Sequence, residues 1–430
     1  MRNPFTADEN SFQKPKSRVV ALFAYKAAAD VAAKLVLFAI TVVAARRLTP
    51  AGFGVFSLGS TLGWMAAVGA DFGMQLHLAR AVARAPDQAA PLLATWLRVR
   101  LWTLAAAFAL VLVGIAAARS NADVAGPIVV LALVYGVSGL VEFLHYFYRG
   151  LSRTDIESSL TFWQRGATLV LGLAALAWRP TVGSLSVAML VPAVLTLAVS
   201  LRIAKRVTAG PLAGRILPQP AQFRRDVAPI GAGILLSALY FRVDVFLVQL
   251  WSGTEAVAFY NAVFRVIEGL RLFPAAALAV ALPALCRARD LRPLVNVASG
   301  LVAGACLVTA LAWPAADWIV PLLFGERYAP AIPAFRILLF AFPLLSLNYA
   351  LTHQLIGWDG QRAYAGVCAV ALVVNLALNA RLIPLLSIEG AAWATVGTEL
   401  VVSAGCVVAL LRTSVIDARE EVTDWAVRTG

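Results

Sequence analysis

Residues 239–287 read LYFRVDVFLVQLWSGTEAVAFYNAVFRVIEGLRLFPAAALAVALPALCR. Two apolar runs flank a short turn at Ser252 and Gly253, and each is long enough to cross a lipid bilayer as a helix, which takes about 20 residues. Charged side chains nevertheless stand inside both runs. Because an ionisable group at mid-membrane costs about 2.5–3.5 kcal/mol on insertion scales, such residues indicate a functional site. The segment therefore predicts a helical membrane hairpin with a polar face.

The whole chain shares this apolar character. Of its 430 residues, 61% are hydrophobic and 14% are charged, and the mean hydropathy is +0.81. Soluble domains are about 45–50% apolar and about 25% charged, so the composition excludes a soluble enzyme, a disordered chain and a secreted scaffold. The four cysteines lack CxxC spacing and predict neither a zinc site nor a disulfide framework. They are Cys286, Cys306, Cys368 and Cys406.

Apolar runs separated by charged or Gly/Pro-rich loops predict twelve membrane spans. These are 19–45, 53–78, 92–118, 127–148, 156–178, 181–204, 226–251, 257–285, 294–323, 332–357, 363–386 and 390–412. The predicted fold is an all-α polytopic membrane protein with about 12 transmembrane helices in two six-helix lobes around a central cavity. The chain is expected to divide into an N-terminal tail (1–18), a first lobe (19–204), a basic linker (205–225), a second lobe (226–412) and a C-terminal tail (413–430).

The basic residues orient this bundle. The formal net charge is +13, and the predicted loops on one side hold about 23 Lys and Arg, Arg100 among them, against 5 on the other. The positive-inside rule places the first set, with both termini, in the cytoplasm. The same rule accounts for the positive charge, so no nucleic-acid partner is expected. The segments 51–62 and 256–267, each following the first span of a lobe, are faintly similar and indicate a parallel internal repeat.

Nine charged residues fall near the middle of predicted spans. They are Lys26, Asp30, Lys34, Arg165, Arg242, Asp244, Arg265, Glu268 and Arg271. The first three share one helix face, Glu268 can reach the arginines three residues to either side, and Arg242 and Asp244 point in nearly opposite directions. Without Lys26, five cations face three anions. A buried positive surplus needs an anion to complete it, and arginine binds phosphate bidentately.

The pattern therefore predicts a cationic cavity for an anionic substrate, formed by Lys26, Lys34, Arg165, Arg242, Arg265 and Arg271. The alternative is that the charges are ion pairs that hold helices together. The carboxylates Asp30, Asp244 and Glu268, and also Asp71 and Glu399, are candidates to carry H+ or Na+ as a coupling ion. No metal, cofactor or catalytic residue is predicted, because the chain has no GxSxG, HExxH, Walker A or GxGxxG motif.

Four segments resemble Wzx-type oligosaccharide flippases, polysaccharide biosynthesis proteins of the multidrug/oligosaccharidyl-lipid/polysaccharide exporter superfamily. Residues 45–84 match the opening pattern of that family through Arg47, Leu48, Pro50, Phe53, Gly54, Phe56, Asp71, Phe72, Gly73 and Arg80. Residues 239–287 are similar to the start of its second half, and 323–339 and 375–401 to its later helices. The alanine-rich spans three to six depart from the family, which leaves the glycan unidentified.

This resemblance implies alternating access by two rocking lobes around a cationic cavity. The expected substrate is an undecaprenyl-pyrophosphate-linked oligosaccharide for surface polysaccharide, moved across the bacterial cytoplasmic (inner) membrane with coupling to an ion gradient. The site residues that carry over are Arg242, Asp244, Arg265 and Glu268, and more loosely Lys26, Asp30 and Lys34. Expected partners are membrane lipids and the polysaccharide polymerase and chain-length machinery.

Two other functions compete with this one. An ion-coupled drug antiporter of the same superfamily would need a net acidic cavity for cationic drugs. A polytopic polysaccharide polymerase or ligase would carry a large external loop, whereas the longest predicted external loop has about a dozen residues, short of the length typical of functional loops. A scaffold without transport would leave the charges inside the spans unexplained.

Overall fold

The computed structural model describes residues 16–118, 121–208, 227–287, 291–358 and 360–429. All the regular structure in these ranges is helical, which confirms the predicted class. The elements are α1 (Lys16–Arg47), α2 (Pro50–Asp71), α3 (Met74–Arg84), η2 (Pro86–Gln88), α4 (Ala89–Ala117), α5 (Ala122–Gly150), α6 (Thr154–Trp178), α7 (Val182–Val207), α9 (Ala228–Leu270), α10 (Leu272–Arg287), α11 (Arg292–Ala312), α12 (Ala316–Phe324), η4 (Glu326–Ala331), α13 (Ile332–Gly357) and α14 (Gln361–Thr429). Most of the predicted N-terminal tail and basic linker lies outside the described residues.

The helices supply the twelve predicted crossings, although some are joined. Nine helical stretches in the searched part of the chain are long and apolar enough to span a membrane. Two of them contain a backbone break and make two crossings each. α9 turns back at Gly253 (φ 84°, ψ 179°), and α14 turns back at Ser387 (φ 52°, ψ −127°). Together with α1, which begins before the searched residues, these stretches give twelve crossings of a multi-pass membrane protein.

Three predicted spans are interrupted where the sequence pattern showed continuous helix; one of them, 257–285, is divided between α9 and α10 at Arg271. Span 53–78 breaks at Phe72 and Gly73, which both adopt positive φ, and α3 follows as a short helix. The backbone N–H of Gly73 donates to Asp71 Oδ2 over 3.1 Å, which secures the break. Span 294–323 divides after Ala312, because Pro314 in the following turn cannot donate the backbone hydrogen bond that would extend the helix.

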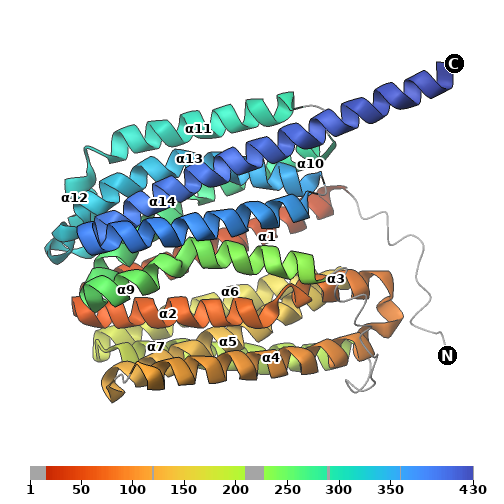
Figure 1. Cartoon of the computed structure of the whole chain (residues 1–430). Helices are drawn as coiled ribbons and strands as arrows, with labels where there is room; N and C mark the ends of the chain where they lie inside the picture. The colour runs from red at the N-terminus through yellow and green to blue at the C-terminus, as the bar shows by residue number, and fades with distance from the viewer. Residues whose placement is uncertain (1–15, 119–120, 209–226, 288–290, 359, 430) are drawn as a thin grey trace, which may run out of the picture.

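The helices form the two predicted lobes (Figure 1). In the first lobe, α5 packs between α2 and α7, and α6 packs against α1 and α7. In the second lobe, α14 packs against α9 and α13, and α11 packs on the outside of α13. The lobes meet where α2 and α9 lie side by side across the middle of the bundle. The charged stretches of α9 therefore border the first lobe.

The buried side chains show that the lobes are joined unequally at their two ends. We call the end that carries Gly253 and Ser387 the kink end, and the opposite end, where α1 begins and α14 ends, the terminal end. At the kink end one apolar core contains residues of both lobes, including Ile40, Phe53 and Tyr328. Toward the terminal end each lobe has its own core. The apolar core that both lobes share thus lies at the kink end, whereas toward the terminal end the lobes have separate cores and meet where Phe72 and Gly73 approach Gly231 of α9.

Two arginines fasten the lobes to each other at the kink end. Arg46, near the end of α1, donates from Nε to the Leu323 carbonyl over 2.8 Å and from Nη2 to the Leu322 carbonyl at the end of α12. In return, Arg327 of η4 donates to the carbonyls of Arg46 and Leu48, at 2.5 and 3.2 Å. Each guanidinium satisfies carbonyls at the C-terminal end of a helix in the other lobe, where the helix dipole also favours a cation. We call this pair the arginine latch.

Replacing both latch arginines with alanine is expected to open the kink end. A cation at a helix C-terminus contributes about 0.3–1 kcal/mol at exposed positions, so losing two should shift the balance of states several-fold. Spin labels on Thr181 and Leu322, exposed positions in different lobes at this end, would report a larger population at long distance. Arg179→Ala is the control, since Arg179 stacks on its neighbour Trp178 within one lobe. An unchanged distance distribution would show that the latch does not hold the lobes.

Candidate functional site

Three arginines of the second lobe surround one carboxylate. Arg265 Nη1 lies 2.6 Å from Glu268 Oε2, and Arg242 Nη1 lies 4.0 Å from Glu268 Oε1. Arg271 is close enough to act electrostatically on the same carboxylate. We call Arg242, Arg265, Glu268 and Arg271 the arginine cluster. Within these four residues three cations face one anion, while the carboxylates of Asp244 and Glu399 act at longer range on Arg242 and Arg271.

The turn at Gly253 brings these residues together. Arg242 stands in the first arm of α9, and Arg265 and Glu268 stand in the returning arm. Two phenylalanines, one from each arm, meet edge to face with ring centroids 5.4 Å apart and support the guanidinium groups. Arg242 lies 4.9 Å over the Phe264 ring, and Arg271 lies 4.6 Å over the Phe241 ring. These are favourable cation–π distances.

The cluster has a buried side and an accessible side. Arg242 is 3% exposed, and its Nη1 has no hydrogen-bond partner among the described residues. Arg265 and Glu268 keep side-chain exposures of 31% and 23%. An anion approaching the cluster would therefore meet Arg265 and Glu268 first.

The first lobe contributes a fourth predicted arginine to the same region. Arg165 of α6 is half-buried and interacts electrostatically with Tyr135 and Glu142 of α5. Tyr135 also interacts with Arg265 of the second lobe. Tyr135 thus belongs to the electrostatic surroundings of an arginine from each lobe. Glu142, an exposed carboxylate that the sequence pattern did not assign to the site, adds a negative charge on the first-lobe side.

Asp244 faces away from the cluster, as its spacing from Arg242 predicts. Its carboxylate accepts hydrogen bonds from the Tyr260 hydroxyl and, over 2.8 Å, from the backbone N–H of Val245. The Tyr260 hydroxyl also lies 3.2 Å from Thr395 Oγ1 of α14. Asp244 is therefore held by neutral donors inside the second lobe.

Glu399 of α14 is a second buried carboxylate with neutral partners. Asn348 Nδ2 donates to its Oε2 over 2.7 Å, and Ser403 Oγ donates to Asn348 Oδ1 over 2.7 Å. Arg271 acts on Glu399 only at longer range. Among the described residues neither carboxylate has an arginine within ion-pair distance, so uptake of a cation there would not require an ion pair to break first.

No described contact joins the predicted site residues of α1 to the arginine cluster. Lys34 is exposed. The backbone of α1 includes Lys26 and Asp30, but their side chains lie outside the described residues.

Arg100 is a buried residue that sequence analysis assigned to a cytoplasmic loop. It is 1% exposed inside α4, its Nη2 donates to the Ala67 carbonyl over 3.1 Å, and its Nη1 lies 3.9 Å from Asp71 Oδ1. Arg100 falls inside the predicted span 92–118, near its start, and was nevertheless counted with the cytoplasmic charges; α4 carries it into the lobe. The uncharged neighbours Thr95 and Trp96, which are also buried, were the sequence signal that this stretch lies inside the lobe.

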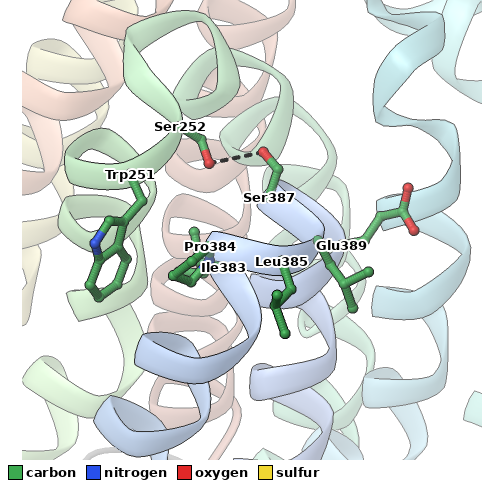
Figure 2. Close-up of a pocket in the computed structure, with 8 residues that line it drawn as sticks. Trp251, Ser252, Ile383, Pro384, Leu385, Ser387 and Glu389 are labelled. Atoms are coloured by element: carbon green, nitrogen blue, oxygen red, sulfur yellow. Dashed lines mark hydrogen bonds between the residues drawn. The ribbon is translucent and has the colours of Figure 1, made fainter.

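A separate hollow of about 560 Å³ lies at the kink end (Figure 2). It is lined by Trp251, Ser252, Ile383, Pro384, Leu385, Leu386, Ser387 and Glu389. Ser387 Oγ donates to Ser252 Oγ over 2.9 Å, which ties the turns of α9 and α14 together. Trp251 and Glu389 project to opposite sides, so the polar groups do not converge on a common point. The hollow contains none of the predicted site residues.

Twelve apolar crossings in two lobes, with a charged cluster on the surface that borders the opposite lobe, define the class of membrane exporters. The chain belongs to the polysaccharide biosynthesis protein family, whose family model matches residues 19–289. The resemblance seen in the sequence is thereby confirmed at the level of the family. A search of curated proteins gives no match.

Solved structures of the same fold are transporters of the MOP superfamily. A multidrug resistance MATE family transporter in its inward-facing conformation is 16% identical, with a TM-score of 0.71 over 90% of this chain and 96% of that one. An outward-facing structure with the same description gives 0.61 at 16% identity, over 92% and 96%. A MOP superfamily transporter from Pyrococcus furiosus, described as having a binding pocket of reverse polarity, gives 0.64 at 15% identity, over 92% and 96%.

Proposed function

We propose that this exporter is a flippase that moves an undecaprenyl-pyrophosphate-linked oligosaccharide from the cytoplasmic to the periplasmic leaflet of the bacterial inner membrane. The product would feed the synthesis of O-antigen, capsule or exopolysaccharide. The observation that carries the proposal is the arginine cluster, in which three guanidinium groups share one carboxylate. A diphosphate supplies the missing negative charge and the oxygen geometry that arginine binds bidentately.

The packing of the lobes supports alternating access. Separate cores at the terminal end would allow the lobes to part there once the contact of Phe72 and Gly73 with Gly231 is broken, and the positive-inside rule places that end in the cytoplasm, where the lipid-linked substrate is made. The shared core and the arginine latch close the opposite end. Rocking the lobes would break the latch and expose the cluster to the periplasmic side, as in hinge and shear closures of other proteins.

Ion coupling would use the carboxylates that have no close arginine. Asp244 and Glu399 meet this description, since Tyr260 and Asn348 are their respective neutral donors. Binding of H+ or Na+ there would change the charge of the second lobe beside the arginine cluster. Glu268, a third predicted carrier, is already occupied by Arg265. The polysaccharide polymerase and chain-length machinery remain predicted partners.

Drug export is the competing function, since the MATE structures named above have the same fold. A cluster with three arginines around one carboxylate opposes the binding of cationic drugs. A polymerase or ligase is disfavoured, because the family and the similar structures are not described as enzymes.

A strain that lacks the gene separates these functions. We expect it to lose surface polysaccharide, to accumulate the lipid-linked oligosaccharide on the cytoplasmic side, and to keep its susceptibility to cationic drugs and dyes. Polysaccharide gel profiles, extraction of lipid-linked sugars and growth inhibition by ethidium are the measurements, with the gene restored on a plasmid as control. Normal polysaccharide combined with increased drug susceptibility would show that the protein is a drug antiporter and not a flippase.

A further inference from the structure

Glu268 occupies the position in the arginine cluster that a bound anion would take. Its two oxygens are directed at different arginines, Oε2 at Arg265 over 2.6 Å and Oε1 toward Arg242 at 4.0 Å. Arg242 Nη1 has no hydrogen-bond partner among the described residues, so the longer contact leaves donor capacity unused. The single carboxylate thus leaves part of the hydrogen-bonding capacity of the arginines unused, whereas an anion with more oxygens could use it fully.

Two of the three arginines, Arg242 and Arg271, are supported by aromatic rings and not by Glu268 alone. Arg242 is supported by Phe264 and Arg271 by Phe241, and the two rings contact each other. This stack of two rings and two guanidinium groups keeps the cations near each other against their mutual repulsion, with part of the stabilisation coming from the ring faces. Arg242 and Arg271 would therefore keep their places if the carboxylate left, and Arg265 would be free to bind the incoming anion.

Glu268 also has room to leave. Its side chain is 23% exposed, and α9 ends two residues later at Leu270. At the next residue, Gly269, a Cβ would meet no atom of another helix within 4 Å, so the turn that carries Glu268 is not tightly packed on that side.

From these contacts we propose that Glu268 is an internal counter-ion, which neutralises part of the cluster when the transporter is empty and is displaced by a diphosphate group when substrate binds. The inference rests on the flippase function proposed above and deepens it. In this proposal Glu268 competes with the substrate anion for the arginines and is not part of a permanent structural ion pair. It also explains why the accessible side of a cationic site carries a carboxylate.

The test compares Glu268→Gln with the unaltered protein, each purified as the full chain in nanodiscs of neutral phosphatidylcholine. Binding of inorganic pyrophosphate is measured by titration calorimetry. Removing the competing carboxylate while keeping the shape of the side chain is expected to tighten pyrophosphate binding about tenfold or more, which corresponds to about 1.4 kcal/mol. Equal or weaker binding by Glu268→Gln would overturn the proposal.

Asp317→Asn is the matched control. Asp317 pairs with Arg336 at 2.7 Å, as Glu268 pairs with Arg265, but this pair is exposed at the kink end. If Asp317→Asn tightens pyrophosphate binding as much as Glu268→Gln, the effect is one of net charge and the proposal fails. Should Glu268→Gln prove unstable, Glu268→Asp draws the carboxylate back by one methylene and is expected to tighten binding by a smaller factor.

A transport readout distinguishes displacement from a structural role. With a fluorescent undecaprenyl diphosphate in proteoliposomes, Glu268→Gln should lower both KM and kcat, because the anion binds more tightly and is no longer expelled by the returning carboxylate. A lower kcat with an unchanged KM would contradict the proposal. If pyrophosphate binds as expected but the gene-deletion strain makes normal polysaccharide, the counter-ion role stands and the flippase function fails.

Discussion

Replacing Arg242 and Arg265 together with glutamine is expected to abolish export of surface polysaccharide while the protein remains in the membrane at its normal level. The change leaves Glu268 without its two nearest cations and lowers the net charge of the cluster from about +2 to about zero, so an anionic substrate is no longer attracted. The measurement is the polysaccharide profile of a deletion strain that carries the variant. Quantitative blotting and a thermal-shift assay of the purified protein accompany it.

The matching control breaks an ion pair of similar length outside the site. Arg336→Gln removes the partner of Asp317, 2.7 Å away, and should leave the polysaccharide profile unchanged. Replacing the two cluster arginines with lysine keeps the charge but loses bidentate binding, so we expect partial function. If the glutamine variant is present in the membrane and the strain makes normal polysaccharide, the cluster is not part of the transport site.

Gly54→Ala is expected to reduce transport at least tenfold through the contact between the lobes. A Cβ on Gly54 would lie 2.0 Å from the backbone oxygen of Thr254 in the other lobe, so α2 and α9 would have to separate at the kink end. Overpacking of this kind costs about 1–3 kcal/mol, and here the cost falls on the closed state of the kink end. Spin labels at Thr181 and Leu322 should report the same opening that follows loss of the arginine latch.

Gly69→Ala provides the comparison within the same helix. Gly69 also faces α9, but its Cβ would meet only Leu235 Cδ1, at 3.9 Å, which is an ordinary contact. Both substitutions improve helix propensity by the same amount, about 1 kcal/mol, so any difference between them arises from the lobe interface. Equal transport by the two variants would show that close approach at Gly54 is not required.

The candidate site was only partly predictable. The contact between Arg265 and Glu268 follows from their spacing of three residues on one helix. That Arg242 approaches the same carboxylate depends on where α9 turns back, and Gly253 marked the turn without setting the rotation of either arm. Arg100 was counted with the cytoplasmic charges and Glu142 was not assigned to the site, because the pairing of charges between helices is not encoded in the spacing of either helix alone.

The sequence by itself determined the number, length and apolar character of the crossings. The thickness of the bilayer sets the length of each run, and the absence of water in its core requires each run to satisfy its backbone hydrogen bonds locally. The predicted span 332–357 coincides with α13 for this reason. Only the tertiary structure decided that three arginines share Glu268, that Arg46 reaches Leu322 in the other lobe, and that the lobes share a core at one end alone. Those contacts join residues far apart in the chain, and their geometry depends on how whole helices pack.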